Sequence, residues 1–555
     1  MTWEDVAAER QQHRAKTIAE VQPAVPGVPS ELPLNVTAIP RQLLPAEVVT
    51  ITEQTTEDLV LALANGRLSA LAVTQAFLQR AGLACKLTNC ITELMPRRAL
   101  DRAQYLDQYY KDHQKPIGPL HGVPISVKEH IGMKDLDWNA GFVSWVGKTA
   151  PKDAFILQLL WNSGAVFYAR TTQPQTLMHL ETSNNLYGVT VNPFNRSLTC
   201  GGSSGGEGAL GGMRGSCLGI GTDIGGSIRS PAANQGLFGL RPTSYRLPCG
   251  GFAATMLGEE QIVPVVGPIS TSLGGIKLFM KSLIDQQPWL HEAALLPFPW
   301  KETSSSGTLL RQGQDGRRKL RVGVLTDDGI VKPHPPVLRG LKTLVDKLKV
   351  HPDVELVDFP PLRHEHAWSI ISSLYFADGG SEEREAIDAS GEPWRPLSKF
   401  ILIDNPNVKK LSVPEVWKWT VEREAYRDAY AAHWNSTASE DGHALDVVLC
   451  PVGPGCAPPI DCARYWSYTS QWNLLDYPSI VFPTGLSCQP ELDPAETTYT
   501  PRNAHDKYNH ELYKPETYVD APISLQLVGR RYEDEKVIEA LEMISELADM
   551  PEVGI

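Results

Sequence analysis

The sequence lacks three features that would each indicate a particular class of protein. It has no basic excess, because 51 Lys and Arg residues stand against 64 Asp and Glu, for a formal net charge of −13. Without a basic stripe we expect no nucleic-acid partner. No apolar run approaches the ~18 residues of a membrane-spanning helix, and the N-terminus has no apolar signal core. We therefore expect no membrane partner and a cytoplasmic location.

Cysteine is also scarce and shows no pairing pattern. The nine cysteines are an odd number spread over 555 residues, with no CxxC pair. That distribution is typical of reduced thiols rather than of a disulfide framework. No His/Cys cluster has the spacing of a zinc site, so the sequence predicts neither a metal nor another cofactor.

The N-terminal fifty residues differ from the rest. Residues 2–20 predict a helix, with Thr2 and Asp5 at the spacing of a capping box, and six prolines follow between positions 23 and 45. We interpret residues 1–50 as a helix plus a proline-rich arm, and residues 51–550 as one large domain.

Helix-like and strand-like segments alternate along that domain. The stretch GVPISVKEH (122–130) alternates like a strand and carries Lys128 near its end. The segment 320–359 predicts a strand, a helix and a second strand, while 302–318 predicts a mobile surface loop. This alternation predicts an α/β fold, with a mixed, twisted β-sheet covered by helices on both faces.

Glycine is concentrated in one region, with twelve between residues 201 and 226. A phosphate-binding loop is disfavoured, because there is no GxxxxGK[ST] and GIGTDIGG misses the GxGxxG spacing by one residue. A nucleophile elbow is a second interpretation, since GGSSG places Ser203 or Ser204 at the centre of G-x-S-x-G. An elbow needs a strand directly before it, whereas NRSLTC is polar and loop-like.

A third interpretation uses the second glycine cluster, DIGGS (223–227). Two glycines let consecutive backbone N–H groups converge on one oxygen, so we expect donors from Ile224, Gly225, Gly226 and Ser227. A helix that begins near Ser227 adds its positive end to them. This arrangement suits a serine that attacks an amide carbonyl, because it stabilises the oxyanion.

These stretches together resemble a known family. GGSSGGEGAL (201–210), GTDIGGSIRSPAA (221–233), GLRPT (239–243) and GPLHGVPISVKEH (118–130) resemble the amidase signature family. PQTLMHLETSNNLYGVTVNPFN (174–195) and APISLQLVGRR (521–531) look most like its fungal acetamidase branch. The similarity runs over roughly residues 50–545.

The resemblance implies an amide hydrolase that works through an acyl-enzyme. Ser227 would be the nucleophile, Ser203 would lie on a cis peptide and relay the proton, and Lys128 would be the base. Lys128 must then be neutral, so burial must lower its pKa from about 10.4. No histidine is required. The remaining implied residues are Asp223 and Arg229, which would brace the loop by hydrogen bonds, and Leu177, whose backbone would line the acyl site.

Several points stay open. Glu129 stands where aspartate is common in the family, and Asn234 and Gln235 replace an aromatic and a small residue. The substrate is a small aliphatic amide or a larger aryl or secondary-metabolite amide, with 373–380 and 463–477 as candidate pocket walls. Alternatives are an amidotransferase A-type subunit and a catalytically silent family member. Homodimer formation is also open.

Overall fold

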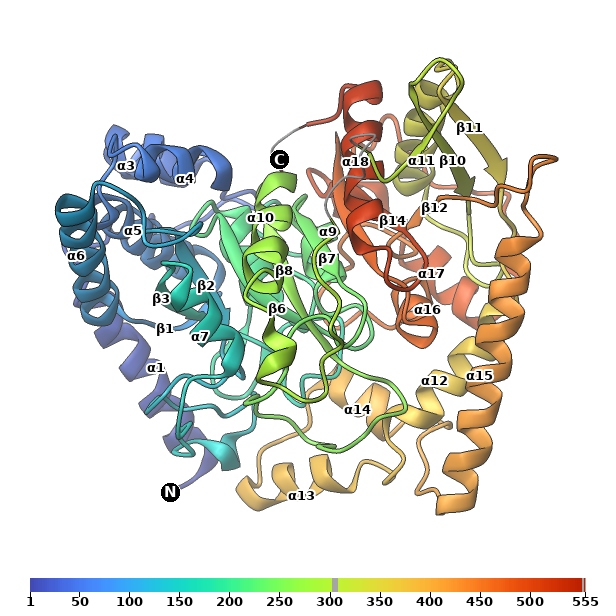
Figure 1. The fold of residues 1–555 in the computed structure, drawn as a ribbon. Coiled ribbons are helices and arrows are strands. Elements are labelled where there is room, and N and C mark those ends of the chain that lie inside the picture. The colour runs from blue at the N-terminus through green and yellow to red at the C-terminus, as the bar shows by residue number, and fades with distance from the viewer. Residues whose placement is uncertain (302–307, 552–553, 555) are drawn as a thin grey trace.

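The computed structural model describes residues 1–301, 308–551 and 554, and within them one large twisted sheet runs through the molecule (Figure 1). Twelve strands of the described chain belong to it. Their order is β1 (Ile91–Leu94), β3 (Val166–Thr171), β2 (Pro124–Lys128), β6 (Leu218–Asp223), β8 (Val265–Ser270), β7 (Phe238–Arg241), β13 (Ser479–Ser487), β14 (Pro522–Val528), β12 (Val447–Pro451), β10 (Arg318–Val324) and β11 (Val354–Asp358), with β9 (Arg311–Gln312) paired to β10.

The sheet is mixed. β2 is parallel to both of its neighbours, β3 and β6, and β10 is parallel to β11 and β12. The five pairings from β6 through β8, β7, β13 and β14 to β12 are antiparallel. A separate two-stranded ladder joins β4 (Ser183–Asn184) and β5 (Gly188–Val189).

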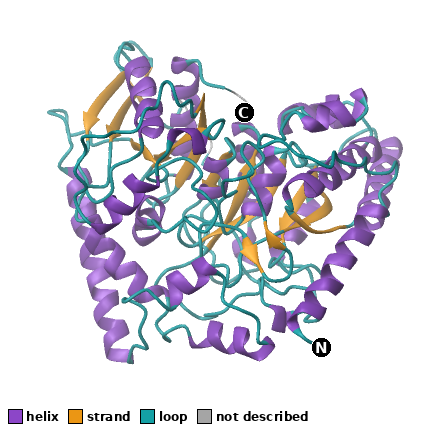
Figure 2. Cartoon of the chain, turned by 180° about the vertical axis from the view of Figure 1, so that it is seen from behind, coloured by secondary structure: helices purple, strands orange, loops and turns teal. Residues whose placement is uncertain are grey.

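Helices flank this sheet in both views (Figures 1 and 2). They are α1 (Trp3–Ala19), α2 (Ile39–Leu43), α3 (Ala46–Thr52), α4 (Thr56–Ala64), α5 (Ala70–Thr88), α6 (Pro96–His113), α7 (Phe155–Asn162), α8 (Gly205–Gly212), α9 (Arg229–Asn234), α10 (Leu273–Ile284), α11 (Pro335–Leu348), α12 (His364–Tyr375), α13 (Ser381–Ser390), α14 (Pro396–Leu402), α15 (Val413–Asn435), α16 (Ser467–Leu475), α17 (Ala504–Leu512) and α18 (Asp534–Ala548). Helices α5 and α6 pack near β3, and α11 and α18 pack against β14. The predicted α/β class and mixed sheet are confirmed.

The N-terminal residues form the helix and the capping box that the sequence predicts. Helix α1 is capped by Thr2 and Asp5 in a reciprocal capping box. The proline-rich arm contains two short helices, α2 and α3, and its residues Val21 and Val36 are buried in the same core cluster as the sheet. The division near residue 50 stays a prediction. Of the predicted loop 302–318, residues 302–307 lie outside the described residues, and Arg311–Gln312 pairs with β10 instead of looping.

The centre of the sheet is what positions the site. Every residue of β2, β3 and β6 is buried, so a polar side chain at the end of these strands meets protein rather than water. Lys128 ends β2 and Asp223 ends β6. Parallel neighbours end at the same edge of a sheet, which brings these two ends close to the loops that follow them. In the part of the chain that is described, no helix is both long enough and apolar enough to span a bilayer.

Candidate active site

Lys128 is completely buried and paired with two hydroxyls. Its side chain has no exposed surface. Nζ lies 2.6 Å from Ser203 Oγ and 2.9 Å from Thr222 Oγ1. A surface lysine at a strand end, the ordinary interpretation of such a position, is therefore excluded.

Burial shifts the acid–base behaviour of this lysine. Removal from water lowers the pKa of Lys128 to about 7, although the negative charges of Asp223 and Glu207 act in the opposite direction. At neutral pH a substantial fraction of the side chain is thus uncharged. A neutral amine 2.6 Å from a serine hydroxyl can accept that hydroxyl's proton.

Ser203 lies two residues before the start of α8, on a cis peptide bond with Gly202. A Cβ at Gly202 would collide with the backbone of Glu181 and His179, which explains the glycine there. The neighbouring Ser204 faces elsewhere: its Oγ accepts the Thr222 N–H at 3.2 Å and lies 3.3 Å from the Thr222 carbonyl. The segment just before Ser203 is not a strand, so the nucleophile-elbow interpretation loses its structural basis.

Ser227 follows β6 through two closely packed glycines. A Cβ at Gly225 would meet the Tyr375 hydroxyl and the Trp466 ring, and Gly226 has a φ of +129° that favours glycine. The Tyr375 hydroxyl donates to the Ile224 carbonyl at 2.7 Å. Because the C=O and N–H of one peptide point in opposite directions, this bond turns the Gly225 N–H away from α12.

Of the four backbone N–H groups expected to be free to bind an oxyanion, one is already hydrogen-bonded within the protein. Gly226 N–H donates to Asp223 Oδ1 at 2.8 Å, so it is already engaged. The N–H groups of Ile224, Gly225 and Ser227 have no hydrogen-bond partner among the residues that the structure describes. Three donors beside Ser227, rather than four, are thus open to a ligand. The helix that follows, α9, is short and begins at Arg229.

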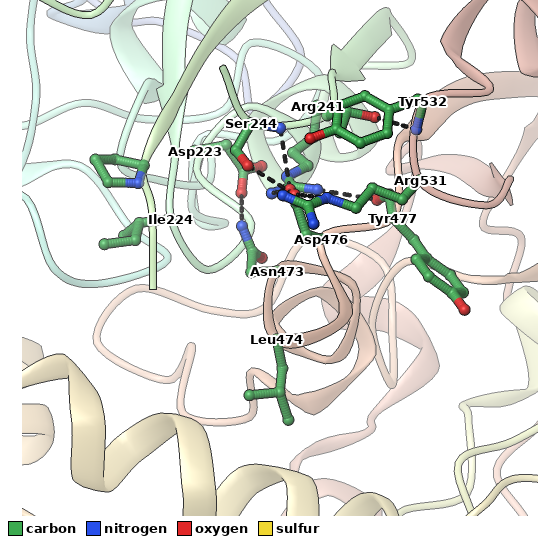
Figure 3. Close-up of polar contacts among 12 residues, drawn as sticks. Asp223, Ile224, Arg241, Ser244, Asn473, Leu474, Asp476, Tyr477, Arg531 and Tyr532 are labelled. Atoms are coloured by element: carbon green, nitrogen blue, oxygen red, sulfur yellow. Dashed lines mark hydrogen bonds and ion pairs between the residues drawn. The ribbon is translucent and has the colours of Figure 1, made fainter. Parts of the chain in front are cut away.

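Asp223 and Arg229, for which the resemblance implies a bracing role, form a buried ion pair beside Ser227. Arg229 Nε and Nη2 each lie 3.0 Å from an Asp223 oxygen, and Asp223 also accepts the Ile228 N–H at 3.1 Å. The Arg229 guanidinium holds the pKa of Asp223 far below its usual range, against the effect of burial. The amide of Asn473 on α16 donates to Asp223 at 2.9 Å (Figure 3).

A second buried carboxylate, Asp476, lies at the same end of α16, where it follows the last residue of the helix. Asp476 accepts a 2.7 Å bond from Arg241 and a 2.6 Å bond from the Ser244 hydroxyl, and Arg531 lies 2.6 Å from its other side (Figure 3). Asn473 and Asp476 thereby tie the loop that carries Ser227 to strand β7 and to the segment after β14. Removing one partner of such a buried pair leaves an uncompensated buried charge, which is strongly destabilising.

A cavity of ≈ 370 Å³ is lined by some of the predicted residues, but not by Lys128, Gly225, Gly226 or Arg229. Its wall includes Ser203, Ser227, Leu177, Ile224 and Asp223. The rest of the wall is mostly loop 249–259, together with His130, Thr176, Met178, Thr222, Pro264 and Val265. The candidate segments 373–380 and 463–477 do not line it. Tyr375 and Trp466 pack behind the Gly225 backbone instead.

The positions that depart from the family pattern have local roles. Glu129 accepts the N–H groups of Asn139 and Ala140 at 2.7 and 3.1 Å, so it holds that loop. Gln235 donates to the Cys200 carbonyl at 3.0 Å. Asn234 lines a separate cavity of ≈ 70 Å³ behind α9.

A buried lysine that contacts a serine on the wall of a mostly apolar cavity is suited to the hydrolysis of acyl compounds such as amides and esters. The Amidase family model matches residues 72–538, and the chain belongs to that family of amide-hydrolysing enzymes. The chain is 45% identical to C550.07 of Schizosaccharomyces pombe, which is named as an amidase, and 39% identical to the acetamidase of Emericella nidulans, in each case over 98% of both chains. It is similar to the solved structure of a fatty acid amide hydrolase, with 35% identity and a TM-score of 0.91 over 99% of this chain and 96% of that chain. The predicted family and enzyme class are confirmed.

Proposed function

We propose that this amidase cleaves amides through an acyl-enzyme formed on Ser227, with Lys128 as the base and Ser203 as the proton relay. The observation that carries the proposal is the 2.6 Å contact between Ser203 and a lysine whose pKa burial lowers to about 7. Lys128 Nζ takes the Ser203 proton while Ser203 takes the proton of Ser227. Ser227 Oγ then bonds to the amide carbon, and the carbonyl becomes an oxyanion.

The remaining steps return every group to its starting state. The N–H groups of Ile224, Gly225 and Ser227 hold the oxyanion, because no other partner engages them among the described residues. Collapse of the intermediate breaks the C–N bond, and the leaving nitrogen receives the proton held by Lys128 through Ser203. Water then attacks the ester by the same relay, which releases the carboxylate and restores Ser227.

The cavity favours an apolar acyl group larger than acetyl. Its ≈ 370 Å³ lies at the lower end of the roughly 300–1,000 Å³ typical of pockets for drug-sized ligands. Leu177, Met178, Ile224 and Phe252 supply apolar surface, and its described wall contains no Lys or Arg. The likeness to a protein named fatty acid amide hydrolase agrees with this choice. We therefore favour the larger of the two substrate classes.

A substrate series tests both the activity and the acyl preference. From acetamide to butanamide to hexanamide, kcat/KM should rise by about fourfold per methylene, because each buried CH2 contributes ~0.8 kcal/mol. Benzamide should also be hydrolysed. Met178→Trp, which fills part of the cavity, should lower the rate for hexanamide more than for acetamide. A flat series would refute the acyl preference, and no hydrolysis of any amide would refute the function.

The activity should depend on pH as the base titrates. With the pKa of Lys128 near 7, kcat/KM should rise about tenfold per pH unit below 7 and level off above it, since only the neutral amine accepts a proton. The nearby Glu207 carboxylate raises the pKa of Lys128. Glu207→Gln should therefore move the midpoint to lower pH. A profile that stays flat between pH 5 and 10 would contradict a lysine base.

A further inference from the structure

His130 occupies a position beside Lys128 that the proposed mechanism leaves without a role. It lies two residues beyond Lys128, is 4% exposed, and lines the same cavity. Its ring packs edge-on against Phe252, with ring centroids 5.6 Å apart. A buried imidazole in this place has two nitrogens, and the partners of each can be identified.

The first nitrogen must carry a hydrogen. Nδ1 of His130 lies 2.9 Å from the Ala253 carbonyl oxygen. A carbonyl only accepts, so Nδ1 is the donor. The Ala253 N–H in turn donates to the His130 carbonyl at 2.8 Å. This reciprocal pair fixes the ring in one orientation.

The second nitrogen is then a lone-pair acceptor. Burial lowers the pKa of His130 well below its usual value, and the charges of Lys128 and Arg170 act in the same direction. The ring is thus neutral, and with the hydrogen on Nδ1 its Nε2 is bare. Nε2 lies 3.0 Å from Thr222 Oγ1.

Thr222 links this histidine to the lysine. Its hydroxyl oxygen is 3.0 Å from His130 Nε2 and 2.9 Å from Lys128 Nζ. A hydroxyl has a single hydrogen. Since bare Nε2 can only accept, that hydrogen belongs to the bond with His130, and Thr222 accepts from Lys128.

On the basis of the proposed function, we propose that His130 is a positioning residue that directs the lone pair of Lys128 toward Ser203. A neutral lysine has one lone pair and two N–H groups. If the Thr222 hydroxyl were free to turn, it could donate into that lone pair and block the base. His130 removes this possibility by taking the hydroxyl hydrogen, so the lone pair remains available to Ser203 at 2.6 Å.

Other charged groups near the pair do not replace this role. Asp223 at the end of β6 and Glu207 on α8 act on Lys128 only through their charge, and Arg170 on β3 acts in the same way on His130. Asp223 is bonded to Arg229 and Asn473, and Glu207 to Ser126 and Thr171. The orientation of the Thr222 hydroxyl therefore depends on His130.

A double-mutant cycle in the full-length enzyme tests the proposal. His130→Phe keeps a ring but removes the acceptor, and should lower kcat and the rate of fluorophosphonate labelling roughly 10- to 100-fold with little change in KM. Thr222→Val should have a comparable effect, and the double variant should be little worse than Thr222→Val alone. His130→Gln, whose amide oxygen can accept the hydrogen, should recover part of the rate. Additive losses, or a loss confined to KM, would overturn the proposal.

The pH profile separates orientation from a mere change of pKa. Because the competing hydroxyl bond forms with neutral lysine, the deficit of His130→Phe should persist from pH 8 to pH 10. Full recovery at pH 10 would mean that His130 acts only on the lysine's pKa, and the inference would be wrong. A matched control is His364→Phe: His364 is also buried, both of its nitrogens lack partners among the described residues, and it lies outside the cavity wall.

One measurement reads the protonation of His130 in the unaltered enzyme. Nitrogen-15 NMR of the histidine rings, with the His130 signal assigned from the His130→Gln spectrum, should show hydrogen on Nδ1 and a bare Nε2 at pH 7 to 9. Hydrogen on Nε2 would overturn the inference even if His130→Phe failed to fold. Failure of the proposed function has another signature, because Lys128→Ala and Ser227→Ala would then keep their activity.

Discussion

Lys128→Ala is expected to lower the acylation rate by roughly 10³-fold or more, since a proton with no acceptor stays on the serine pair. Ser203→Ala should also be severe but less so, because a water molecule in the space left by the hydroxyl can bridge Lys128 and Ser227. The two side chains act as one unit across a 2.6 Å contact. The double variant should therefore be little worse than Lys128→Ala alone, as measured by single-turnover hydrolysis.

A matched substitution distinguishes loss of the base from loss of packing. Lys128 is completely buried, so alanine leaves a cavity that can itself disturb β2. Lys128→Met keeps most of the side-chain volume and removes only the amine. Both variants should be equally inactive, while Lys128→Met should retain the higher melting temperature. Recovered activity in Lys128→Met, or additive losses in the double variant, would contradict the relay.

The elements that carry the site could be predicted because their signals are local. The sequence alternates between apolar and polar residues around Lys128, which predicts β2. The glycines at 225 and 226 indicate that other residues pack closely against the backbone there. The structure shows which ones, since a side chain at these positions would meet Tyr375, Trp466 or Thr469. The strand–helix–strand unit β10–α11–β11 follows from its hydrophobic pattern and is confirmed by the parallel register Leu320 to Val354. Short-range patterns of this kind fix both secondary structure and the placement of single residues on it.

The cavity wall could not be predicted in the same way. Loop 249–259 has no periodic pattern, and its position depends on contacts with distant parts of the chain: Met256 N–H donates to Glu382, 126 residues away. The brace on Asp223 comes from Asn473, 250 residues away. His130 and Thr222 were present in the stretches that drew attention to the site. Their partnership, however, depends on β2 and β6 being neighbours, which no spacing in the sequence encodes.

Ser227→Ala should abolish hydrolysis, with a loss on the order of 10⁵-fold or more, because the substitution removes the hydroxyl oxygen that forms the acyl-enzyme in the proposed mechanism. A serine-directed fluorophosphonate should add one phosphonyl group per chain to the unaltered enzyme, on the peptide that contains Ser227, and none to Ser227→Ala. The melting temperature should change little, since Ser227 is 6% exposed at the cavity and alanine removes only its hydroxyl.

Ser204→Ala is the control for the nucleophile-elbow interpretation. That interpretation would make Ser204 the nucleophile, whereas the proposed mechanism assigns this role to Ser227. Ser204 Oγ bonds only to the Thr222 backbone within the described chain, so its loss should cost about 1 kcal/mol of stability and leave labelling intact. If Ser204→Ala lost both turnover and labelling while Ser227→Ala kept them, the nucleophile would be Ser204. The backbone donors beside Ser227 would then have no oxyanion to hold, and the mechanism built on Lys128 and Ser203 would have to be abandoned.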